Sequence, residues 1–560
     1  MTASCQPTSQ KTTTEKSWNR LEVAKVLDRI AQSHLHWGTL TDIAEESGVP
    51  RTTVIHWKKR KESIDHESEV VDFFESAIGV AFLQQMMVAV TFVLTQIAGG
   101  GIRSVSLFLQ LSRLDRFVGS SYGAQQNYVM QMERIIGDFG QEERERLASK
   151  MPAKRITVCQ DETFHPKPCL LAIEPISNFI IMEQYAEKRD AATWNQTMDA
   201  ALKGLNVKVF QSTGDEAMGL INHAVLHLGA HHSPDLMHVQ QELSRATQGP
   251  LAAQTRHYEK EHDKMCKKVQ KKATKAEKSR KKVDLIAAST ATGERNLTQL
   301  ALENSEKVQE ESRETIKALG ENYHPFDLKT GAPRSSNETK KILTEPIMKL
   351  RVISAKRGLS EKTDKRINKA SRVVEKMIAT ILFFFCSIHE YVRELNLSPD
   401  LESLIHSQLI PSYYIEYAAN KAKDPETRKN LAEKATELRR LFNKRDGPWC
   451  KLSDVERERV TCVAKECAGV FQRSSSCVEG RNGQLSLWHH GRHSLSKRKL
   501  QALTTIHNYF TLRCDGTTAA ERFFAAKPRD MYDYLLKHMP LPVRPARSRA
   551  GGYRRFSHAA

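Results

Sequence analysis

Apolar residues recur at two different periods along the chain, and the change of period marks a change of fold. Up to about residue 150 they lie three and four positions apart, which is typical of amphipathic helices. From Arg155 onward short apolar runs predict strands, with helical segments between them. The predicted order is strand 156–159, strand 169–173, strand 178–182, helix 191–205, strand 207–213, helix 217–228 and a short last segment, 229–232.

The strand pattern ends after Val239, and the chain is then charged and helical until it reaches Ser474. This stretch predicts an all-helical insertion within the α/β region. Residues 256–282 carry twelve Lys or Arg against four Asp or Glu, on what the pattern predicts as one long helix. Such a run is either a solvated face or a surface that contacts phosphates, and both interpretations stay open. The apolar segment 377–391 is expected to form the core of the later helices.

Residues 40–61 have the pattern of a helix-turn-helix. Ile43, Ala44 and Val54 can close a small core, and Gly48 allows the backbone conformation that the turn needs. The second helix then presents five candidate contacts to a DNA groove: Arg51, Thr52, Thr53, His56 and Lys59. An ordinary helical hairpin is the alternative. Segment 102–123, which follows three glycines, is a candidate for a second helical DNA-binding unit.

Composition favours a polyanionic partner such as nucleic acid. The 560 residues include 85 Lys and Arg against 66 Asp and Glu, a formal net charge of +19, and the chain is long enough for several domains. Gln84 and Gln85 interrupt the apolar stretch 77–94, so we interpret it as a buried helix and expect no membrane association. The start of the chain has no signal-peptide pattern. Ten cysteines without a C-x-x-C pair indicate reduced thiols in a cytosol.

Three acidic residues lie where a site for divalent metal would need them. Asp161 ends the first predicted strand, Asp215 follows the fourth, and Glu479 lies in a helical segment after the insertion. If the first strand is central and the fourth lies beside it, the two aspartates are neighbours and a late helix delivers the glutamate. Carboxylates that hold two Mg²⁺ (or Mn²⁺) ions support phosphoryl transfer on DNA. Glu162 and Glu216 are alternative ligands, and each aspartate can also be a turn or capping residue.

The motifs QDETFHP, STGDEAMG, HHSPDLMHV and SSSCVEGRNGQLSLWHHGRH resemble those of bacterial insertion-sequence transposases with an Asp-Asp-Glu triad. The resemblance extends from the helix-turn-helix to the late segment DGTTAAERFF. It implies a ribonuclease H-like α/β core with a mixed five-stranded sheet, and Asp161, Asp215 and Glu479 as the metal-binding triad. Asp235 and His238 resemble the C/D-x-x-H motif of hAT and Mutator-like transposases, in which the histidine helps to organise the active site.

The resemblance implies an enzyme that cuts DNA at transposon ends and joins the exposed 3′-hydroxyl to target DNA. The expected partners are double-stranded DNA, as terminal inverted repeats and as target, and at least one further copy of the chain, because two ends must meet. The expected location is the bacterial cytoplasm, in association with the nucleoid. A domesticated DNA-binding protein that no longer cuts is the main alternative, and a metal-dependent hydrolase using Asp161 and Glu162 on a smaller substrate is another.

The remaining expectations concern boundaries and supporting residues. Arg481 and Asn482 are candidates for contacts to phosphate or DNA ends, with a structural role at a helix end as the alternative. His231, His232, Asp235 and His238 also suggest a zinc site, although no further ligand completes it. The expected domains are 1–65 (helix-turn-helix), 66–150 (helical), 151–245 (first catalytic part), 246–470 (insertion), 471–535 (second catalytic part) and 536–560 (a disordered basic tail).

Overall fold

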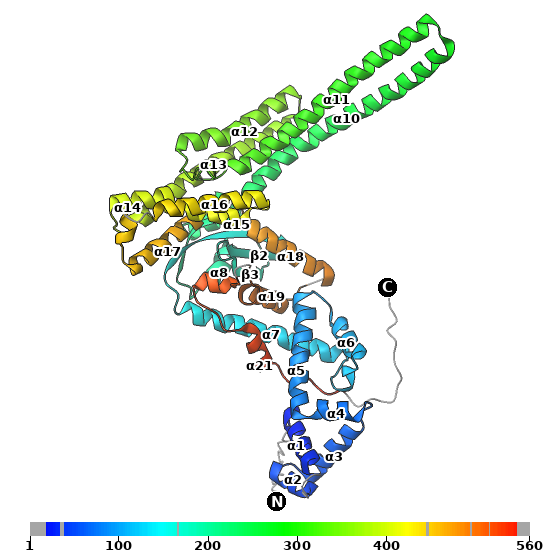
Figure 1. Ribbon diagram of the computed structural model, residues 1–560, viewed down its shortest axis with the longest axis vertical. Coiled ribbons are helices and arrows are strands. Elements are labelled where there is room, and N and C mark those ends of the chain that lie inside the picture. The colour runs from blue at the N-terminus through cyan, green and yellow to red at the C-terminus, as the bar shows by residue number, and fades with distance from the viewer. Residues whose placement is uncertain are drawn as a thin grey trace, which may run out of the picture. The chain divides into compact units, whose positions relative to one another are not determined.

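The computed structural model describes residues 18–33, 39–164, 167–443, 447–492, 495–513 and 516–545 (Figure 1). The chain forms two compact units. The first contains the chain up to Leu147 together with Leu487–Glu521 and the residues from Ala526 onward, and the second contains Ala148–Ser486 with Arg522–Ala525. Whereas the sequence predicts residues 471–535 as one piece of the catalytic domain, most of the residues after Ser486 thus pack with the N-terminal helices.

The first unit begins with the predicted helix-turn-helix. Helices α2 (Leu40–Ser47) and α3 (Arg51–Glu62) pack with α1 (Arg20–Ser33) around a small apolar core that includes Ala44 and Val54. Thr39 begins α2 through a capping box with Asp42, in which each side chain accepts a hydrogen bond from the other residue's backbone N–H. Gly48 ends this helix with a φ of +61°. The helix pair, its turn and its core are therefore confirmed.

The first unit continues with further helices. Of the described helices, the segment Ala77–Ile97 alone is long and apolar enough to cross a membrane by length and composition, and 39% of its most apolar window is buried. Ile78 and Phe82 are exposed while Val80 and Leu83 are fully buried, so the predicted burial holds for one face only. The elements are α4 (Ser68–Glu75), α5 (Ala77–Phe92), η1 (Val93–Ile97), α6 (Ile102–Leu111), η2 (Leu114–Arg116), α7 (Tyr122–Ala148), α19 (Lys497–Tyr509) and α21 (Met531–His538).

The expectation of disorder over 536–560 is wrong for its first ten residues. After α21 the chain is held against the N-terminal helices, because Arg20 Nη1 donates to Pro542 O at 3.0 Å and Gly119 N donates to Val543 O at 2.8 Å. Arg544 forms an ion pair with Glu75, whose side chain is 3% exposed. A buried acid thus gives this arginine a partner that its basic surroundings in the sequence do not reveal. Arg547, Arg549, Arg554 and Arg555 lie outside the described residues.

The second unit contains a mixed five-stranded sheet, as predicted. Its strands are β1 (Lys154–Phe164), β2 (Pro168–Glu174), β3 (Phe179–Tyr185), β4 (Val207–Gly214) and β5 (His231–Pro234), in the spatial order β3-β2-β1-β4-β5. Strands β1, β2 and β3 pair antiparallel, whereas β4 is parallel to β1 and β5 is parallel to β4. Helices α8 (Ala191–Leu202) and α9 (Met218–Asn222), with η3 (His223–His227), connect the later strands. The first strand is central, with the fourth beside it.

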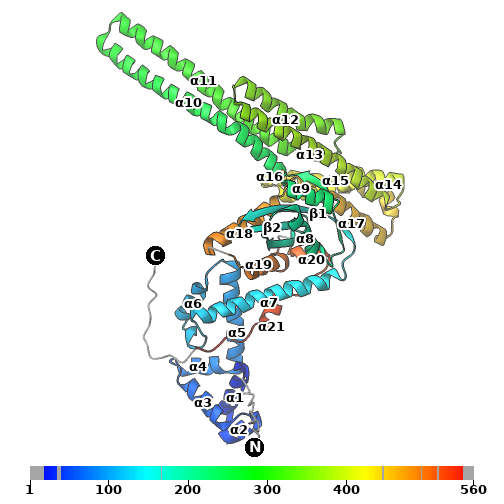
Figure 2. The ribbon, with the colours of Figure 1, turned by 180° about the vertical axis from the view of Figure 1, so that it is seen from behind.

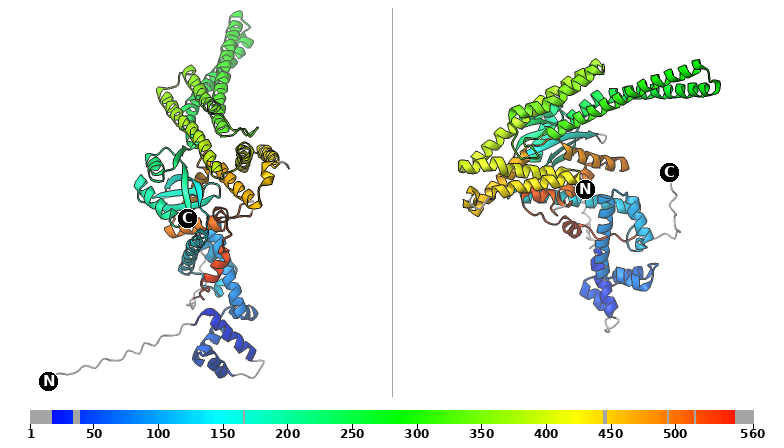
Figure 3. Two further views of the ribbon diagram at one scale, coloured as in Figure 1. Left: turned by 90° about the vertical axis from the view of Figure 1, so that its left-hand side faces the viewer. Right: turned by 45° about the horizontal axis from the view of Figure 1, so that its top comes forward.

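The helical insertion is confirmed, but its first helix begins ten residues earlier than the predicted boundary. Helix α10 (Leu236–Ser279) starts directly after β5 and runs through Pro250 without a break, side by side with α11 (Lys282–Asn322) (Figures 2 and 3). Met377, Phe384 and Ile388 are buried in the insertion's core, as the apolar segment predicts. The other helices are α12 (Ser336–Lys356), α13 (Glu361–Arg393), α14 (Pro399–Leu404), η4 (Ile405–Leu409), α15 (Ile410–Lys421), α16 (Pro425–Phe442), η5 (Pro448–Lys451) and α17 (Asp454–Val470).

Helix α18 (Ser476–Arg492) returns the chain from the insertion to the sheet. Val478, at its start, is fully buried in an apolar cluster with Leu171 and Ile180 of the sheet. Arg481 donates from Nε and Nη2 to the two carboxylate oxygens of Glu183 on β3, both at 2.7 Å. The two side chains are 7% and 0% exposed. An apolar contact and a bidentate ion pair therefore fix the first turns of α18 on the sheet.

Replacement of Arg481 by Ala removes the bidentate ion pair of Glu183, whose side chain stays buried. We expect this variant to lose about 3–5 kcal/mol of the free energy of unfolding, measured by urea denaturation followed by circular dichroism. The double variant Arg481→Met with Glu183→Leu removes both charges and is expected to recover most of the loss. A cost below about 1 kcal/mol for Arg481→Ala, the range of an exposed ion pair, would show that this contact does not anchor α18.

Candidate metal centre

Three aspartates gather at one edge of the sheet. Asp161 lies two residues after Cys159, which pairs with Thr213 of β4, and Asp215 lies two residues after Thr213. Asp235 directly follows Pro234, the residue of β5 that pairs with Gly214. Because β1, β4 and β5 are parallel, their carboxyl ends lie at the same edge. The sheet thus brings Asp161 and Asp215 together, as predicted, and adds Asp235 beside them.

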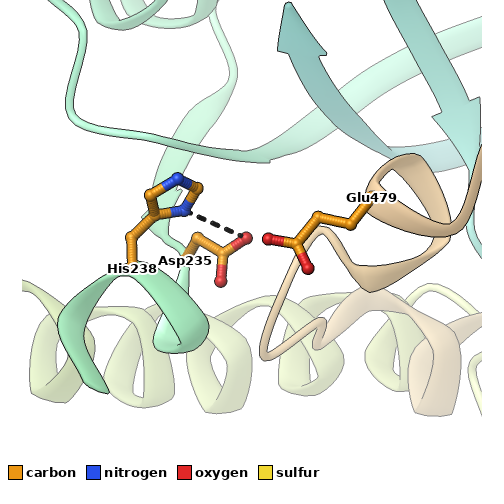
Figure 4. A group of neighbouring side chains, drawn as sticks. All are labelled: Asp235, His238 and Glu479. Carbon is orange, nitrogen blue, oxygen red and sulfur yellow. Dashed lines mark ion pairs between the residues drawn. The ribbon is translucent and has the colours of Figure 1, made fainter. Parts of the chain in front are cut away.

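Glu479 reaches this edge from the first turn of α18. Its carboxylate lies with Asp235 and His238 in a group whose ligand atoms are all within 4.8 Å of one another (Figure 4). The three side chains point toward one another, and the imidazole Nδ1 of His238 lies 3.7 Å from Asp235 Oδ2. Asp161, Asp215 and Glu479 by themselves form no such compact group among the described residues. The compact cluster of potential metal ligands therefore contains one residue of the predicted triad, Glu479, and the two predicted supporting residues, Asp235 and His238.

Asp235 is the most buried acid of the site, with 1% of its surface exposed. Its Oδ1 accepts from Met237 N at 2.6 Å, which caps the start of α10, and its Oδ2 accepts from Ser475 N at 2.8 Å and from the Ser475 hydroxyl. Ser475, the residue just before α18, is thereby hydrogen-bonded to Asp235, the residue just before α10. This bond sets the position of Glu479, one turn after Ser475.

Asn482 contributes a contact that sequence reasoning left open. Its Nδ2 donates to Asp161 Oδ2 at 3.0 Å, whereas its Oδ1 is buried and has no hydrogen-bond partner. Arg481, by contrast, is turned to the sheet and bound to Glu183, a placement that favours its structural alternative. An unpaired amide oxygen beside carboxylates fits a hard divalent cation, whose preferred ligands are oxygens. The donor set at this edge is therefore compatible with Mg²⁺ or Mn²⁺.

The electrostatics of the site show a surplus of acidic groups. Burial, and to a lesser extent the neighbouring carboxylates of Asp215 and Glu479, raise the pKa of Asp161 to about 6. Burial and then Asp235 also raise the pKa of Glu479. Asp235 in turn raises the pKa of His238. Although burial opposes ionisation of Asp235, contacts with His238 and Ser475 keep its pKa below the usual value. A bound cation would relieve the repulsion among these carboxylates.

The alternative acids have partners of their own, although Glu216 lines the same cavity as Asp215 and Asp235. Successive side chains of a strand alternate between its faces, and Glu162 accordingly accepts from Trp194 Nε1 of α8 at 3.3 Å, away from Asp161. Glu216 forms an ion pair with Lys376 of the insertion and lies 3.4 Å from His232 Nε2. Asp215 itself accepts a hydrogen bond from Ala217 N at 3.0 Å, an Asx-turn contact that occupies one of its two oxygens.

The zinc alternative is not supported by the arrangement of the histidines. His231 stacks on Phe383 of α13 with ring centroids 4.2 Å apart, and His232 faces Glu216. Of the histidines in this segment, His238 alone belongs to a group of potential metal ligands within the described part of the chain. The structure therefore leaves His231 and His232 outside the group that contains Asp235 and His238, so the four residues do not form one zinc site.

A cavity of about 290 Å³ adjoins the acidic edge. Asp215, Asp235 and His238 line one side, and Lys369 of α13 lines it from the insertion. The sequence gives no sign of this lysine, because it reaches the site only through the packing of α13 against β5 and α10. It places a positive charge next to the carboxylates, where a phosphate group would be attracted.

The predicted groove contacts lie on α3, in the first unit. Arg51, Thr52, His56 and Lys59 are exposed, and Thr53 is half-buried. Helix α6, in the segment proposed as a second DNA-binding unit, has ten residues and is followed by the short turn η2. Helix α3 presents the polar side chains expected from the sequence, and the roles of both regions stay predictions.

Comparison with known proteins gives one match. Residues 405–551, about a quarter of the chain, match a family of unknown function, DUF6399. The matched part includes Glu479 and Asn482 but none of the three aspartates. No curated protein matches the chain, and no solved structure does.

The raised pKa of Asp161 predicts a pH-dependent effect of Asp161→Asn on the metal-free protein. Because burial raises this pKa from 3.8 to about 6, the folded protein binds more protons than the unfolded chain between these values, and its stability falls as the pH rises through them. The full penalty remains above pH 6. We expect the variant to be more stable than the wild type by up to about 3 kcal/mol at pH 7, and the gain to vanish near pH 4.

Urea unfolding in the presence of a chelator, at pH 4.5 and pH 7, measures this difference. Glu162→Gln is the control, since it removes a carboxylate from the same strand but from its other face. A gain for Asp161→Asn that is equal at both pH values would contradict the burial of an ionised Asp161.

Proposed function

We propose that the chain is a DNA transposase of the Asp-Asp-Glu type with a ribonuclease H-like core. The supporting observation is the gathering of acidic side chains at the carboxyl ends of β1, β4 and β5, joined by Glu479 from the helix that follows the insertion. A central first strand with the fourth strand beside it is the arrangement that the proposed fold requires. The net charge of +19 and the helix-turn-helix supply the means to bind DNA.

In this proposal Asp161, Asp215 and Glu479 hold two Mg²⁺ or Mn²⁺ ions. Bound ions would activate the attacking hydroxyl and stabilise the leaving oxygen of the phosphodiester. The chain's own residues orient these ligands: Asn482 holds the carboxylate of Asp161, and Asp235 fixes the position of His238. The contact with Asp235 raises the pKa of His238, which favours its positively charged form, and the imidazole can donate to a phosphate oxygen.

DNA recognition is assigned to α3, whose exposed side chains are suited to a major groove. The sites bound would be the terminal inverted repeats of the element, and the same active site would then join the cut end to target DNA. Since two ends must be held at once, the active form is proposed to contain at least two copies of the chain. A bacterial cytoplasmic protein associated with the nucleoid fits this role.

The direct test is metal-dependent cleavage of labelled duplexes taken from the DNA on either side of the coding sequence. We expect Asp161→Asn, Asp215→Asn and Glu479→Gln each to reduce cleavage at least about a thousandfold, because each removes a carboxylate that holds an ion. Glu162→Gln is the matched control and should keep cleavage near the wild-type rate, since its side chain contacts α8.

The outcomes separate the candidate functions. Cleavage by the intact protein that is lost in all three variants, with DNA binding retained, supports the transposase. Specific binding without cleavage under Mg²⁺ or Mn²⁺ would instead favour the domesticated DNA-binding protein. Cleavage that survives Asp215→Asn but not Asp235→Asn would show that the metal ligands are the compact group of Asp235, His238 and Glu479.

Binding to the element's ends depends on α3 in this proposal. Arg51→Ala and Lys59→Ala are each expected to weaken binding by about 1–3 kcal/mol if they contact bases, and by less if they contact only phosphates. Lys25→Ala on α1 removes the same charge from an exposed position outside α3 and is the control. Fluorescence anisotropy with labelled end duplexes measures the affinities. Equal losses for all three variants would leave general charge as the explanation and refute recognition by α3.

A further inference from the structure

The outer half of α10 carries a row of basic side chains on one face. They recur three and four residues apart and are all exposed: Arg256, Lys260, Lys264, Lys267, Lys268, Lys271, Lys275 and Lys278. At 100° per residue these positions fall within an arc of about 120°. We name this set the lysine face. It is part of the hairpin of α10 and α11 whose far end extends beyond α12 and α13 (Figures 1 and 2).

The lysine face is bordered by acidic residues of the same helix, among them Asp263, and its apolar side lies opposite. The acids of the same stretch, Glu259, Glu261, Asp263 and Glu277, fall outside the arc by their helical spacing. The side that packs on α11 lies opposite and contains Ala276, which is 3% exposed. A face designed only for solubility commonly mixes both signs of charge, whereas this one has a single sign over six helical turns.

Half of the face is not neutralised within the protein. Lys264 pairs with Glu261 of the same helix at 4.0 Å, and Lys268 and Lys275 pair with Glu294 and Asp284 of α11. Within the described part of the chain, however, the ammonium groups of Lys260, Lys267, Lys271 and Lys278 make no ion pair. Lysine is a flexible point charge that suits phosphate groups and not the bidentate reading of bases. No aromatic side chain interrupts the row, so its chemistry favours a uniform polyanion over a folded protein partner.

The dimensions of the face match duplex DNA. Arg256 and Lys278 are 22 residues apart, which corresponds to about 33 Å along a helix and thus to about one turn of B-form DNA. The same helix begins at the candidate metal centre, where His238 lies in its first turn. Measured along the helix from His238, the lysine face begins at Arg256 after about 27 Å and ends at Lys278 after about 60 Å.

We propose that the lysine face binds the phosphate backbone of duplex DNA, without sequence preference, along the DNA that leads away from the cut phosphate. The assignment of the cut site rests on the proposed function. Duplex DNA parallel to α10 would be contacted between about 8 and 18 base pairs from the cleaved bond, at 3.4 Å per base pair. The insertion would thereby hold the flanking duplex while the carboxylates hold the scissile phosphate.

The test compares two variants that lose the same charge. The first replaces Lys260, Lys267, Lys271 and Lys278 by Ala, which keeps helix propensity and breaks no ion pair. The control replaces four exposed lysines of α12 and α13 by Ala: Lys340, Lys341, Lys356 and Lys362. The affinity of the full-length protein for a random-sequence 30-base-pair duplex is measured from 50 to 200 mM salt. Circular dichroism and thermal unfolding check that both variants fold.

Release of counterions makes the logarithm of affinity fall with the logarithm of salt by about 0.9 per phosphate contact. We expect the first variant to lower this slope by about 3 to 4 and the control by less than about 1. Over this salt range the affinity of the intact protein should fall about a hundredfold more than that of the first variant. Equal slopes for the two variants would overturn the proposal, and would mean a solvated face or an acidic protein partner.

A footprint on the intact protein keeps the proposal testable if the first variant does not fold. Hydroxyl radicals should leave backbone protection between about 8 and 18 base pairs from the cut site, and its absence would overturn the proposal. The two proposals can fail separately. If the intact protein does not cleave but the slopes differ, the lysine face still binds DNA and the transposase assignment fails. If it cleaves and the slopes are equal, the lysine face alone is refuted.

Discussion

The candidate site depends on one buried carboxylate, that of Asp235. It accepts hydrogen bonds from Met237, at the start of the helical insertion, and from Ser475, at its end. Ser475 lies 240 positions after Asp235 in the sequence. A backbone hydrogen bond from Leu236 N to Arg473 O at 2.9 Å also joins the two ends of the insertion. A buried carboxylate is costly unless its oxygens are fully bonded, so this arrangement is stable only when both ends of the insertion are in place. The position of Glu479 follows from it.

This constraint also explains why the acids of the site differ in character. Asp235 is satisfied by backbone and hydroxyl donors, and its pKa is lowered, so it remains ionised and can hold a positively charged His238 beside it. Asp161 has a single side-chain donor, Asn482, and its pKa is raised to about 6. The carboxylate of Asp235 thus stabilises the fold through its hydrogen bonds, while that of Asp161 has fewer donors and can bind a cation. Such a division between supporting and reactive acids is typical of sites that bind cations.

Much of the sheet could be predicted from the sequence, because β1, β2, β3 and β4 each contain a short apolar run, whereas β5 is a short polar segment. The neighbouring positions of Asp161 and Asp215 followed from that pattern, but the prediction that Asp161 ends its strand is wrong, because β1 continues to Phe164 in its pairing with β2. The partners of single side chains could not be predicted in the same way. Arg481 was expected at DNA or at a helix end and lies on Glu183, and Arg544 was expected in a disordered tail and lies on Glu75. In both cases the partner is a buried acid distant in sequence, and no periodic pattern records such a pairing.

The insertion shows the same division between what periodicity reveals and what tertiary contacts decide. Its length and helical character are evident in the sequence, yet α10 begins at Leu236, because the capping bond of Asp235 lets a helix start two residues after Pro234, the last residue of the sheet. Farther out, α10 and α11 meet through small residues such as Thr255 and Ser305, whose hydroxyls lie 2.8 Å apart, and not through a leucine seam. Small side chains let two helices approach closely and leave their outer faces free for charge. The hairpin can therefore be long and basic without disturbing the site. The hydrogen bonds of Asp235 and Leu236 that join the two ends of the insertion lie at or before the first turn of α10.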